Sequence, residues 1–367
     1  MNSQRLVDTF LKYVQIDSES YNEKEMADTV MAELKSIGCQ VYNDGCGKNF
    51  GSNSGNVYAV LKGDESKETV LFSAHLDTVK PGIGVKPIVK DGIIYSDGTT
   101  VLGGDDKSGV AAIIEALRTI TENNLPHPTI EIVFTICEEV GLIGSSNLDY
   151  SRITAKKAAV LDSSGDAGVI LNSAPGQAKI DGWFIGKSAH AGVSPELGIS
   201  AVQIAAEAVS NMKLLRVDEE TTANVGTMCA EYATNIVPEK VRFIAEARSR
   251  SDEKLAAQKE HMAKCIADAC EKFGGVWEGK ITDTYCAYSH DTSDCWFRSI
   301  VSACENLDIP VCIKSSGGGS DANNMNKNGI KAVVLGTGMS KVHSVKEEIS
   351  IKNLENTTKI ILQLIKQ

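Results

Sequence analysis

Strand-like and helical segments alternate along most of this sequence, and that alternation restricts the fold more than any other feature. Residues 129–137 are typical of a strand, because Ile130, Ile132, Phe134 and Ile136 occupy every second position. Residues 104–120 are typical of a helix, since their apolar side chains recur three or four positions apart. Further strands are predicted at 56–61, 69–74 and 158–161, and two amphipathic helices at 6–14 and 26–37. Interleaved strands and helices of this kind predict an α/β layer structure.

The pattern changes in the middle of the chain. From residue 178 the predicted order is strand, helix, two strands, helix and strand, at 178–185, 199–212, 223–234, 240–247, 252–273 and 277–286. The order β-α-β-β-α-β is typical of a ferredoxin-like α+β domain. A helix at 293–307, a strand at 332–335 and a terminal helix then return to the first pattern. We therefore predict a discontinuous α/β domain, with a mixed sheet flanked by helices, over 1–177 and 287–367. A smaller domain, 178–286, is inserted into it.

Charge and cysteine usage narrow the class of protein. The formal net charge is −11 and no run of Lys or Arg occurs, which argues against nucleic-acid and anionic-membrane partners. No stretch approaches ~18 consecutive apolar residues, and the N-terminus lacks the features of a signal peptide. The ten cysteines are scattered, which is typical of reduced thiols. These features predict a cytoplasmic protein without a membrane span.

Polar residues at predicted strand ends are the candidates for chemistry. His75 and Asp77 follow the strand 69–74 two positions apart, so both side chains point the same way. A histidine there can bind a metal ion while a carboxylate fixes its tautomer. Taken alone, the pair also fits a surface histidine beside a turn.

Two acids, Asp105 and Asp106, open the helix that follows a glycine-containing loop. They fit N-terminal capping, which stabilises a helix by roughly 0.5–2 kcal/mol. They also fit a second role, in which the two oxygens of Asp105 bridge two cations.

Glu138 and Glu139 end a strand that is otherwise apolar. Adjacent like charges at such a position are unfavourable unless a cation or a proton relieves them. One acid can bind a metal ion while its neighbour transfers a proton to and from water. An exposed turn is the alternative.

Asp162 ends another apolar strand, and His343 lies in a loop after a strand near the C-terminus. Two histidines, two aspartates and a glutamate then form a candidate ligand set, with a further glutamate beside it. Nitrogen and oxygen ligands without thiolate suit zinc, cobalt or manganese. Two such ions roughly 3.5–4 Å apart activate water and polarise a carbonyl.

Several motifs carry a resemblance to a known family. They are SAHLDTV, GGDDKSG, CEEVGLIGS, LDSSG and the late His343, in the family's order and spacing. The sequence resembles the peptidase T (tripeptide aminopeptidase) branch of the co-catalytic dizinc peptidases, a superfamily that includes glutamate carboxypeptidase, aminoacylase and succinyl-diaminopimelate desuccinylase. The resemblance covers essentially the whole chain. It implies two divalent ions per chain, with zinc favoured and cobalt or manganese as alternatives.

The resemblance also implies a role for each motif residue. His75 and Asp162 are expected to hold one ion, Glu139 and His343 the other, and Asp105 to bridge the two. The family also implies a cis peptide bond between Asp105 and Asp106. Asp77 is expected to orient His75. Glu138 is expected to act as general base and then as the acid for the leaving amine.

Three residues of the inserted domain resemble the family's substrate-contacting positions. His190 lies in a motif whose histidine stabilises the oxyanion, Asn235 resembles a substrate contact, and Arg248 resembles an arginine that grips a carboxylate. A surface histidine, a turn asparagine and a surface arginine are the alternatives. The family also implies dimerisation through the inserted domain, which would act as a lid.

The expected activity is hydrolysis of an amide bond in a short peptide, by an aminopeptidase that acts on tripeptides or similar substrates. A carboxypeptidase or an N-acyl amino acid deacylase would use the same chemistry. An inactive binding or scaffold homologue is disfavoured, because the ligand set is complete.

Overall fold

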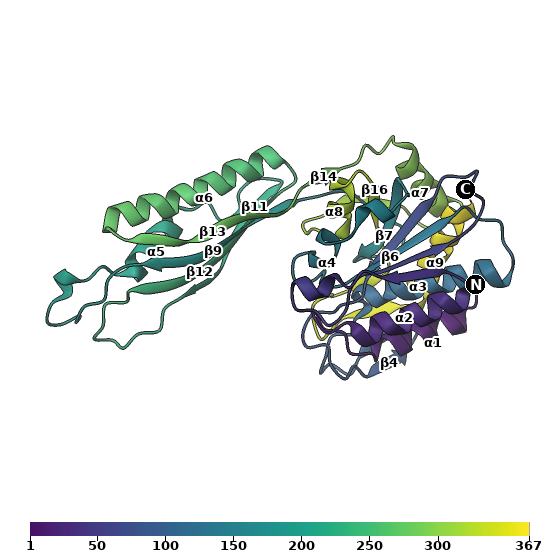
Figure 1. Ribbon diagram of the computed structural model, residues 1–367, viewed down its shortest axis with the longest axis horizontal. Coiled ribbons are helices and arrows are strands. Elements are labelled where there is room, and N and C mark those ends of the chain that lie inside the picture. Colours follow the sequence, from purple (N-terminus) through teal and green to yellow (C-terminus); the bar gives the residue numbers. More distant parts are fainter. Residues whose placement is uncertain (367) are drawn as a thin grey trace. The chain divides into compact units, whose positions relative to one another are not determined.

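In the computed structural model, which describes residues 1–366, the chain divides into two units (Figure 1). Unit 1 comprises Met1–Ser173, His290–Ser316 and the chain from Ser320 onward. Unit 2 comprises Ala174–Ser289 and the short glycine segment Gly317–Gly319. The domain limits predicted from the sequence, 178 and 286, lie a few residues inside those of unit 2. The functional division into a catalytic domain and a lid stays a prediction.

The main sheet of unit 1 is mixed, as predicted. Its strands follow the order β1-β2-β6-β3-β7-β16-β8, and β15 pairs with β8. The neighbours β6, β3, β7 and β16 run parallel, whereas β1, β2 and β8 join antiparallel. The bounds are β1 (Gln40–Asn43), β2 (Val57–Leu61), β3 (Val70–His75), β6 (Ile130–Thr135), β7 (Lys157–Ser163), β8 (Val169–Ala174), β15 (Cys312–Ser315) and β16 (Lys331–Gly336).

A smaller sheet follows the order β17-β18-β5-β4. Its bounds are β4 (Pro87–Lys90), β5 (Ile93–Ser96), β17 (Met339–Ser340) and β18 (Glu348–Ser350). The two-residue strand β14 (Tyr288–Ser289) belongs to unit 2 and is not part of this sheet. The pairing of β18 with β5 brings the C-terminal segment beside the turn-rich region that precedes the predicted helix at 104–120.

Helices flank the sheets of unit 1 (Figure 1). The longest, α3 (Gly104–Glu122), contacts β3 and β7, and helices α1 and α9 pack against it. Helix α2 ends as predicted at Gly38, which has φ +102 and donates to the carbonyls of Leu34 and Lys35. The other bounds are α1 (Ser3–Val14), α2 (Lys24–Ile37), α4 (Ile143–Ser146), α7 (Cys295–Glu305), α8 (Asp321–Lys327) and α9 (Ile351–Lys366), with single turns at Cys46–Asn49 and Tyr150–Arg152.

The parallel register gathers the chemistry at one edge of the sheet. His75 is the last residue of β3 and pairs with Thr135, the last residue of β6. Ser73 pairs with Val160 of β7, so Asp162 lies at the level of His75. Because carboxyl ends of parallel strands meet at the same edge, His75, Asp162 and the residues after β6 converge there.

Strand β6 is buried on both faces, whereas its alternating pattern emphasised only one apolar face. Its second face includes Glu131, which is 2% exposed. That carboxylate accepts the N–H groups of Thr154 and Ala155 at 3.0–3.1 Å. A buried acid is therefore tolerated here because a neighbouring loop supplies its hydrogen bonds.

Unit 2 has an antiparallel sheet of order β10-β11-β12-β9-β13. Its elements are β9 (Gly176–Ile185), α5 (Ala201–Asn211), β10 (Leu215–Arg216), β11 (Thr221–Cys229), β12 (Lys240–Ser249), α6 (Asp252–Phe273) and β13 (Val276–Tyr285), with a single turn at Pro195–Leu197. Phe184, Phe243 and Trp277 form edge-to-face contacts in its core. The short strand β10 was not predicted from the sequence, and the strand predicted at 223–234 ends at Cys229 in the structure.

All ten cysteines are free, as their scatter predicted. Among residues 1–366, no helix combines the length and the apolar character needed to cross a membrane. The cytoplasmic location stays a prediction.

Candidate metal centre and active site

His75 is fixed at the end of β3 by contacts on both ring nitrogens. It is 1% exposed, and its Nδ1 lies 2.9 Å from the carbonyl oxygen of Asp77 and 3.5 Å from the Asp77 carboxylate. A carbonyl oxygen can only accept, so this contact places a proton on Nδ1. Nε2 faces acids, 3.0 Å from Asp105 Oδ1 and 3.7 Å from Asp162 Oδ1. A neutral His75 therefore presents a lone pair to the carboxylates, as a metal ligand does.

Asp105 lies between two histidines. Its Oδ1 is 3.0 Å from His75 Nε2, and its Oδ2 is 3.3 Å from His343 Nε2. The same nitrogen of His343 lies 3.0 Å from Glu139 Oε2. The peptide bond between Asp105 and Asp106 is cis, which confirms the expectation from the family resemblance. The two oxygens of Asp105 thus face two different groups of ligands.

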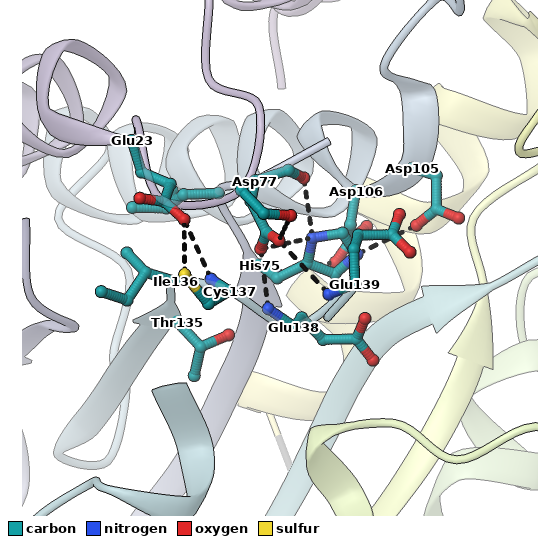
Figure 2. Close-up of polar contacts among 12 residues, drawn as sticks. Glu23, His75, Asp77, Asp105, Asp106, Thr135, Ile136, Cys137, Glu138 and Glu139 are labelled. Atoms are coloured by element: carbon teal, nitrogen blue, oxygen red, sulfur yellow. Dashed lines mark hydrogen bonds and ion pairs between the residues drawn. The ribbon is translucent and has the colours of Figure 1, made fainter. Parts of the chain in front are cut away.

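The segment after β6 presents Glu138 and Glu139 through its backbone. Cys137 has φ +52, an uncommon conformation for a residue with a side chain. The next two N–H groups both donate to Asp77, that of Glu138 to Oδ1 at 2.9 Å and that of Glu139 to Oδ2 at 3.2 Å (Figure 2). Asp77 was predicted to orient His75, and the structure shows that it also holds this segment.

Burial and mutual charge shift the pKa values of the acids in this cluster. Burial, followed by the negative charge of Asp162, raises the pKa of Glu138 well above its usual value. Burial also raises the pKa of Asp162. For Asp105 burial acts in the same direction, but hydrogen bonds from His343 and His75 hold its pKa below the usual value. Hydrogen bonds to Asp105 and Glu139 raise the pKa of His343 to about 10. Positive charge at the centre of this cluster is strongly favoured.

The donor set fits divalent ions. His75, Asp105 and Glu139 each offer a ligand atom, and the three atoms lie within 4.8 Å of one another. His75, Asp106 and Asp162 form a second such group. Within residues 1–366, Glu139 Oε1 is a buried oxygen without a hydrogen-bond partner. Buried, unpaired carboxylate oxygens beside imidazole nitrogens match the preference of zinc and related metals.

Four acids around the cluster had no assigned role in the sequence. Asp106 accepts the N–H groups of His75 and Gly109, both at 3.2 Å. It therefore fixes the backbone at these two residues, in addition to its place in the second group of candidate ligands. Buried Asp321 accepts a short hydrogen bond from the hydroxyl of Thr135. Two further buried acids, Glu23 and Glu347, bind the backbone of ligand-bearing loops. Of these four acids, only Asp106 could have been selected from the sequence, because it is adjacent to Asp105.

Two of the predicted substrate contacts lie together in unit 2. His190 and Asn235 are on neighbouring exposed loops, joined by the bond from the Ala191 N–H to the Asn235 carbonyl at 2.8 Å. Nδ1 of His190 accepts from the N–H groups of Gly192 and Val193, both at 3.2 Å. An Nδ1 that accepts places the ring proton on Nε2, so His190 offers a hydrogen-bond donor.

Arg248 lies on β12 of the same unit. Its Nε and Nη2 donate to the two carboxylate oxygens of Glu246 at 2.9 and 3.0 Å, and Gln177 donates to the same carboxylate. One edge of the guanidinium is therefore paired within the protein. The five-donor fork of arginine leaves its remaining donors for other acceptors.

Comparison with known proteins identifies the family of this chain. The profile of peptidase family M20/M25/M40 matches residues 71–367. The protein YqjE of Bacillus subtilis strain 168, itself uncharacterised, is 41% identical over 367 residues, which cover 100% of this chain and 99% of YqjE.

Two crystal structures of similar sequence share the fold. The aminopeptidase PepT of Bacillus cereus ATCC 10987 has 40% identity and a TM-score of 0.91, covering 100% of this chain and 98% of its own. A tripeptidase of Staphylococcus aureus subsp. aureus Mu50 has 39% identity and a TM-score of 0.95, with the same coverage. This chain therefore belongs to the M20/M25/M40 peptidase family, in its peptidase T-like branch, and is a metallopeptidase.

Proposed function

We propose that this protein is a two-metal aminopeptidase that releases N-terminal residues from tripeptides or similar short peptides. His75 and Asp162 would hold one ion, Glu139 and His343 the other, and Asp105 would bridge the two. Zinc is the favoured ion, with cobalt and manganese as alternatives that suit the same ligands.

The position of Asp105 carries this proposal. Its two oxygens lie 3.0 Å from His75 and 3.3 Å from His343, and a second acid accompanies each histidine. A carboxylate that only capped helix α3 would direct an oxygen to the backbone N–H groups of the first turn instead. Asp105 faces side chains that are themselves metal ligands in many proteins, which supports a bridging role.

Glu138 fits the role of proton carrier. Bound divalent ions would supply Lewis acidity, which favours ionisation of water and polarises a scissile carbonyl. Glu138 would accept a proton from the attacking water and then donate it to the nitrogen of the breaking C–N bond. Burial raises the pKa of Glu138, which suits a carboxyl group that must both take and give a proton.

Unit 2 would act as a lid that completes the site. His190 would donate its Nε2–H to the oxyanion of the tetrahedral intermediate, a contact typically worth about 2.7–4 kcal/mol to the transition state. Asn235 would contact the substrate, and Arg248 would bind a substrate carboxylate through the donors that Glu246 leaves unused. The family resemblance also supports a homodimer formed through this unit.

A metal-binding experiment with two adjacent variants tests the core of the proposal. Wild-type protein, Glu138→Gln and Glu139→Gln are compared for zinc content and for turnover of a tripeptide. We expect two ions per chain in the wild type and in Glu138→Gln, with turnover in Glu138→Gln reduced by roughly 10²–10⁴-fold. Glu139→Gln should lose affinity for one ion. Fewer than one ion per wild-type chain, with activity that resists chelators, would contradict the two-metal reading.

A peptide panel decides which end of the substrate is recognised. Tripeptides with a free amine, an N-acetyl group or an amidated carboxyl end are compared at equal concentration. The aminopeptidase assignment predicts cleavage of free-amine peptides and loss of cleavage after acetylation. Equal cleavage of acetylated peptides would favour the second candidate, a carboxypeptidase or N-acyl amino acid deacylase, which the carboxylate-binding chemistry of Arg248 supports.

A further inference from the structure

Glu347 is a buried acid that belongs to neither group of metal-binding candidates. It is 1% exposed and lies four residues after His343, between that residue and β18. Its Oε2 accepts the N–H groups of Leu102 and Gly103 at 2.8 and 2.9 Å, and its Oε1 accepts that of Asp105 at 2.9 Å. One side chain from the C-terminal segment therefore binds three N–H groups of the loop that presents Asp105.

That loop lacks the usual partners of a helix start. Gly103 is the N-cap of α3, with φ +76 and no side-chain cap, and Asp105 has non-helical φ −80 and ψ 102. The first N–H groups of a helix have no acceptor within the helix itself, and in an irregular first turn they need one from elsewhere. The carboxylate of Glu347 supplies it, at the positive end of the helix dipole, where negative charge is stabilised.

Close approach of the two segments depends on Gly104. A Cβ at this position would lie 3.0 Å from Glu347 Oε1, tighter than almost all real contacts of that kind. The glycine thus allows the carboxylate to reach the loop. An alanine at 104 would bring its Cβ against Glu347 Oε1 and disturb the hydrogen bonds of that carboxylate.

Glu347 is also joined to the turn that carries His343. Lys341 and His343 both have positive φ, +55 and +59, and the N–H of Glu347 donates to the carbonyl of Ser344 at 3.0 Å. Nε2 of His343 in turn lies 3.3 Å from Asp105 Oδ2. Glu347 and His343 therefore contact the same residue, one through its backbone and the other through its side chain.

We propose that Glu347 is a positioning residue of the metal centre, which sets the spacing between Asp105 and His343. This inference rests on the two-ion function proposed above. Because Glu347 acts on the loop of Asp105 and the turn of His343, its loss should weaken chiefly the ion held by Asp105, Glu139 and His343. The ion held by His75 and Asp162 should be less affected, since His75 and Asp162 lie on the strands β3 and β7.

A purely structural role would give a different result. Glu131 provides the matched control, because it is also a buried carboxylate of unit 1 that accepts N–H groups of a loop, those of Thr154 and Ala155. Both Glu131→Gln and Glu347→Gln should lower the melting temperature of the metal-free protein. Only Glu347→Gln should change metal affinity.

The experiment is calorimetric titration of metal-free protein with zinc, supported by circular dichroism to establish folding. In wild type we expect two binding events. In Glu347→Gln one event should weaken by roughly 10–100-fold, a typical effect of removing a partner that orients a metal ligand, and the other, which shares only Asp105 with it, should weaken by a smaller factor. Glu131→Gln should keep both affinities. Gly104→Ala, which perturbs the same contact without touching the acid, should weaken the same event and keeps the test informative if Glu347→Gln does not fold.

Two outcomes would be decisive against the inference. Two events of wild-type affinity in Glu347→Gln, or in Gly104→Ala if only that variant folds, would overturn the positioning role and leave the proposed function intact. Fewer than two events in the wild type would overturn the proposed function and this inference together. Activity gives an independent readout, because turnover of Glu347→Gln should recover as zinc concentration rises, whereas Glu131→Gln should need no additional zinc.

Discussion

Substitution of Glu23 tests how the segment that follows β6 is held in place. Glu23 is fully buried at the start of α2, and its Oε1 accepts the N–H and thiol of Cys137 at 3.1 and 3.0 Å (Figure 2). The same oxygen accepts the N–H of Tyr21 at 2.8 Å. Its Oε2 accepts the hydroxyl of Ser52 at 2.8 Å. Replacing Glu23 with alanine removes all four acceptor contacts at once.

The expected loss of stability in Glu23→Ala follows chiefly from the buried backbone N–H of Cys137. The hydroxyl of Ser52 can rotate and a thiol is a weak donor, so neither dominates. The buried N–H of Cys137 loses its acceptor, at roughly 1–3 kcal/mol, whereas Tyr21 is an exposed residue and adds less. Glu23→Ala should therefore lower the free energy of unfolding by at least about 1–3 kcal/mol, a sizeable part of the ~5–15 kcal/mol typical of a folded protein. Glu23→Gln keeps one acceptor oxygen and should be less damaging.

The same contact bears on catalysis. Cys137 has φ +52, which costs a residue with a side chain roughly 1–2 kcal/mol, and Glu138 follows it directly. Without Glu23 the backbone at 137 can relax and displace Glu138. Displacement by about 1 Å can reduce turnover by ~10²-fold. The double variant Glu23→Ala with Cys137→Gly should recover part of this loss, because glycine adopts positive φ without strain.

The assay is urea denaturation of metal-free protein together with kcat for a tripeptide. Glu25→Gln, an exposed acid in the first turn of the same helix, is the control and should stay within about 0.5 kcal/mol of wild type. Unchanged stability of Glu23→Ala would refute the hydrogen-bond reasoning. Lower stability with unchanged kcat would show that Glu23 supports the fold but does not position Glu138.

Three further predictions concern other properties. Removal of divalent ions by a chelator should lower the melting temperature, and zinc at 100-fold its dissociation constant should restore about 2.7 kcal/mol per site, measured by calorimetry; an unchanged melting temperature would contradict metal binding. Arg248→Lys should raise KM for peptides with a free carboxyl end and leave KM for amidated peptides unchanged, because lysine lacks the planar fork; equal effects on both would exclude carboxylate binding. Burial raises the pKa of Cys39 to about 12, so the folded state keeps this proton while the unfolded chain releases it above about pH 9. Its contribution to stability is complete below that pH and declines toward pH 12, and Cys39→Val should flatten the decline by about 1.4 kcal/mol per pH unit in pH-dependent denaturation.

Features with local causes could be predicted from the sequence. Helix α6 has the predicted bounds, 252–273, because Ser251 caps its first turn and Gly274, with φ +73, ends it. The meeting of His75 with Asp162 was likewise predictable, since both lie at the ends of parallel strands. The ligand role of each residue stays a proposal, which metal binding must test.

Features that depend on distant contacts could not be predicted. Glu347 lies in the mostly polar segment Ser344–Glu348, whose sequence is typical of an exposed loop. Its burial results from N–H groups more than 240 residues away in the sequence. Glu23 is similar, because its acceptor role appears only when Cys137 reaches it. Charge and local pattern do not distinguish such acids from solvated ones.

The choice of acids for these positions has a physical reason. Loops that present ligands cannot satisfy their N–H groups within regular secondary structure, and buried N–H groups require an acceptor. Here the acceptors are carboxylates: Asp77 for Glu138 and its neighbour, Glu23 for Cys137, and Glu347 for the loop of Asp105. Charged acceptors form hydrogen bonds roughly twice as strong as neutral ones. They also add negative potential around the cluster, which a carbonyl or amide acceptor would supply only weakly. Each carboxylate therefore fixes a loop and favours cations, so an isosteric amide should weaken cation binding beyond its effect on geometry.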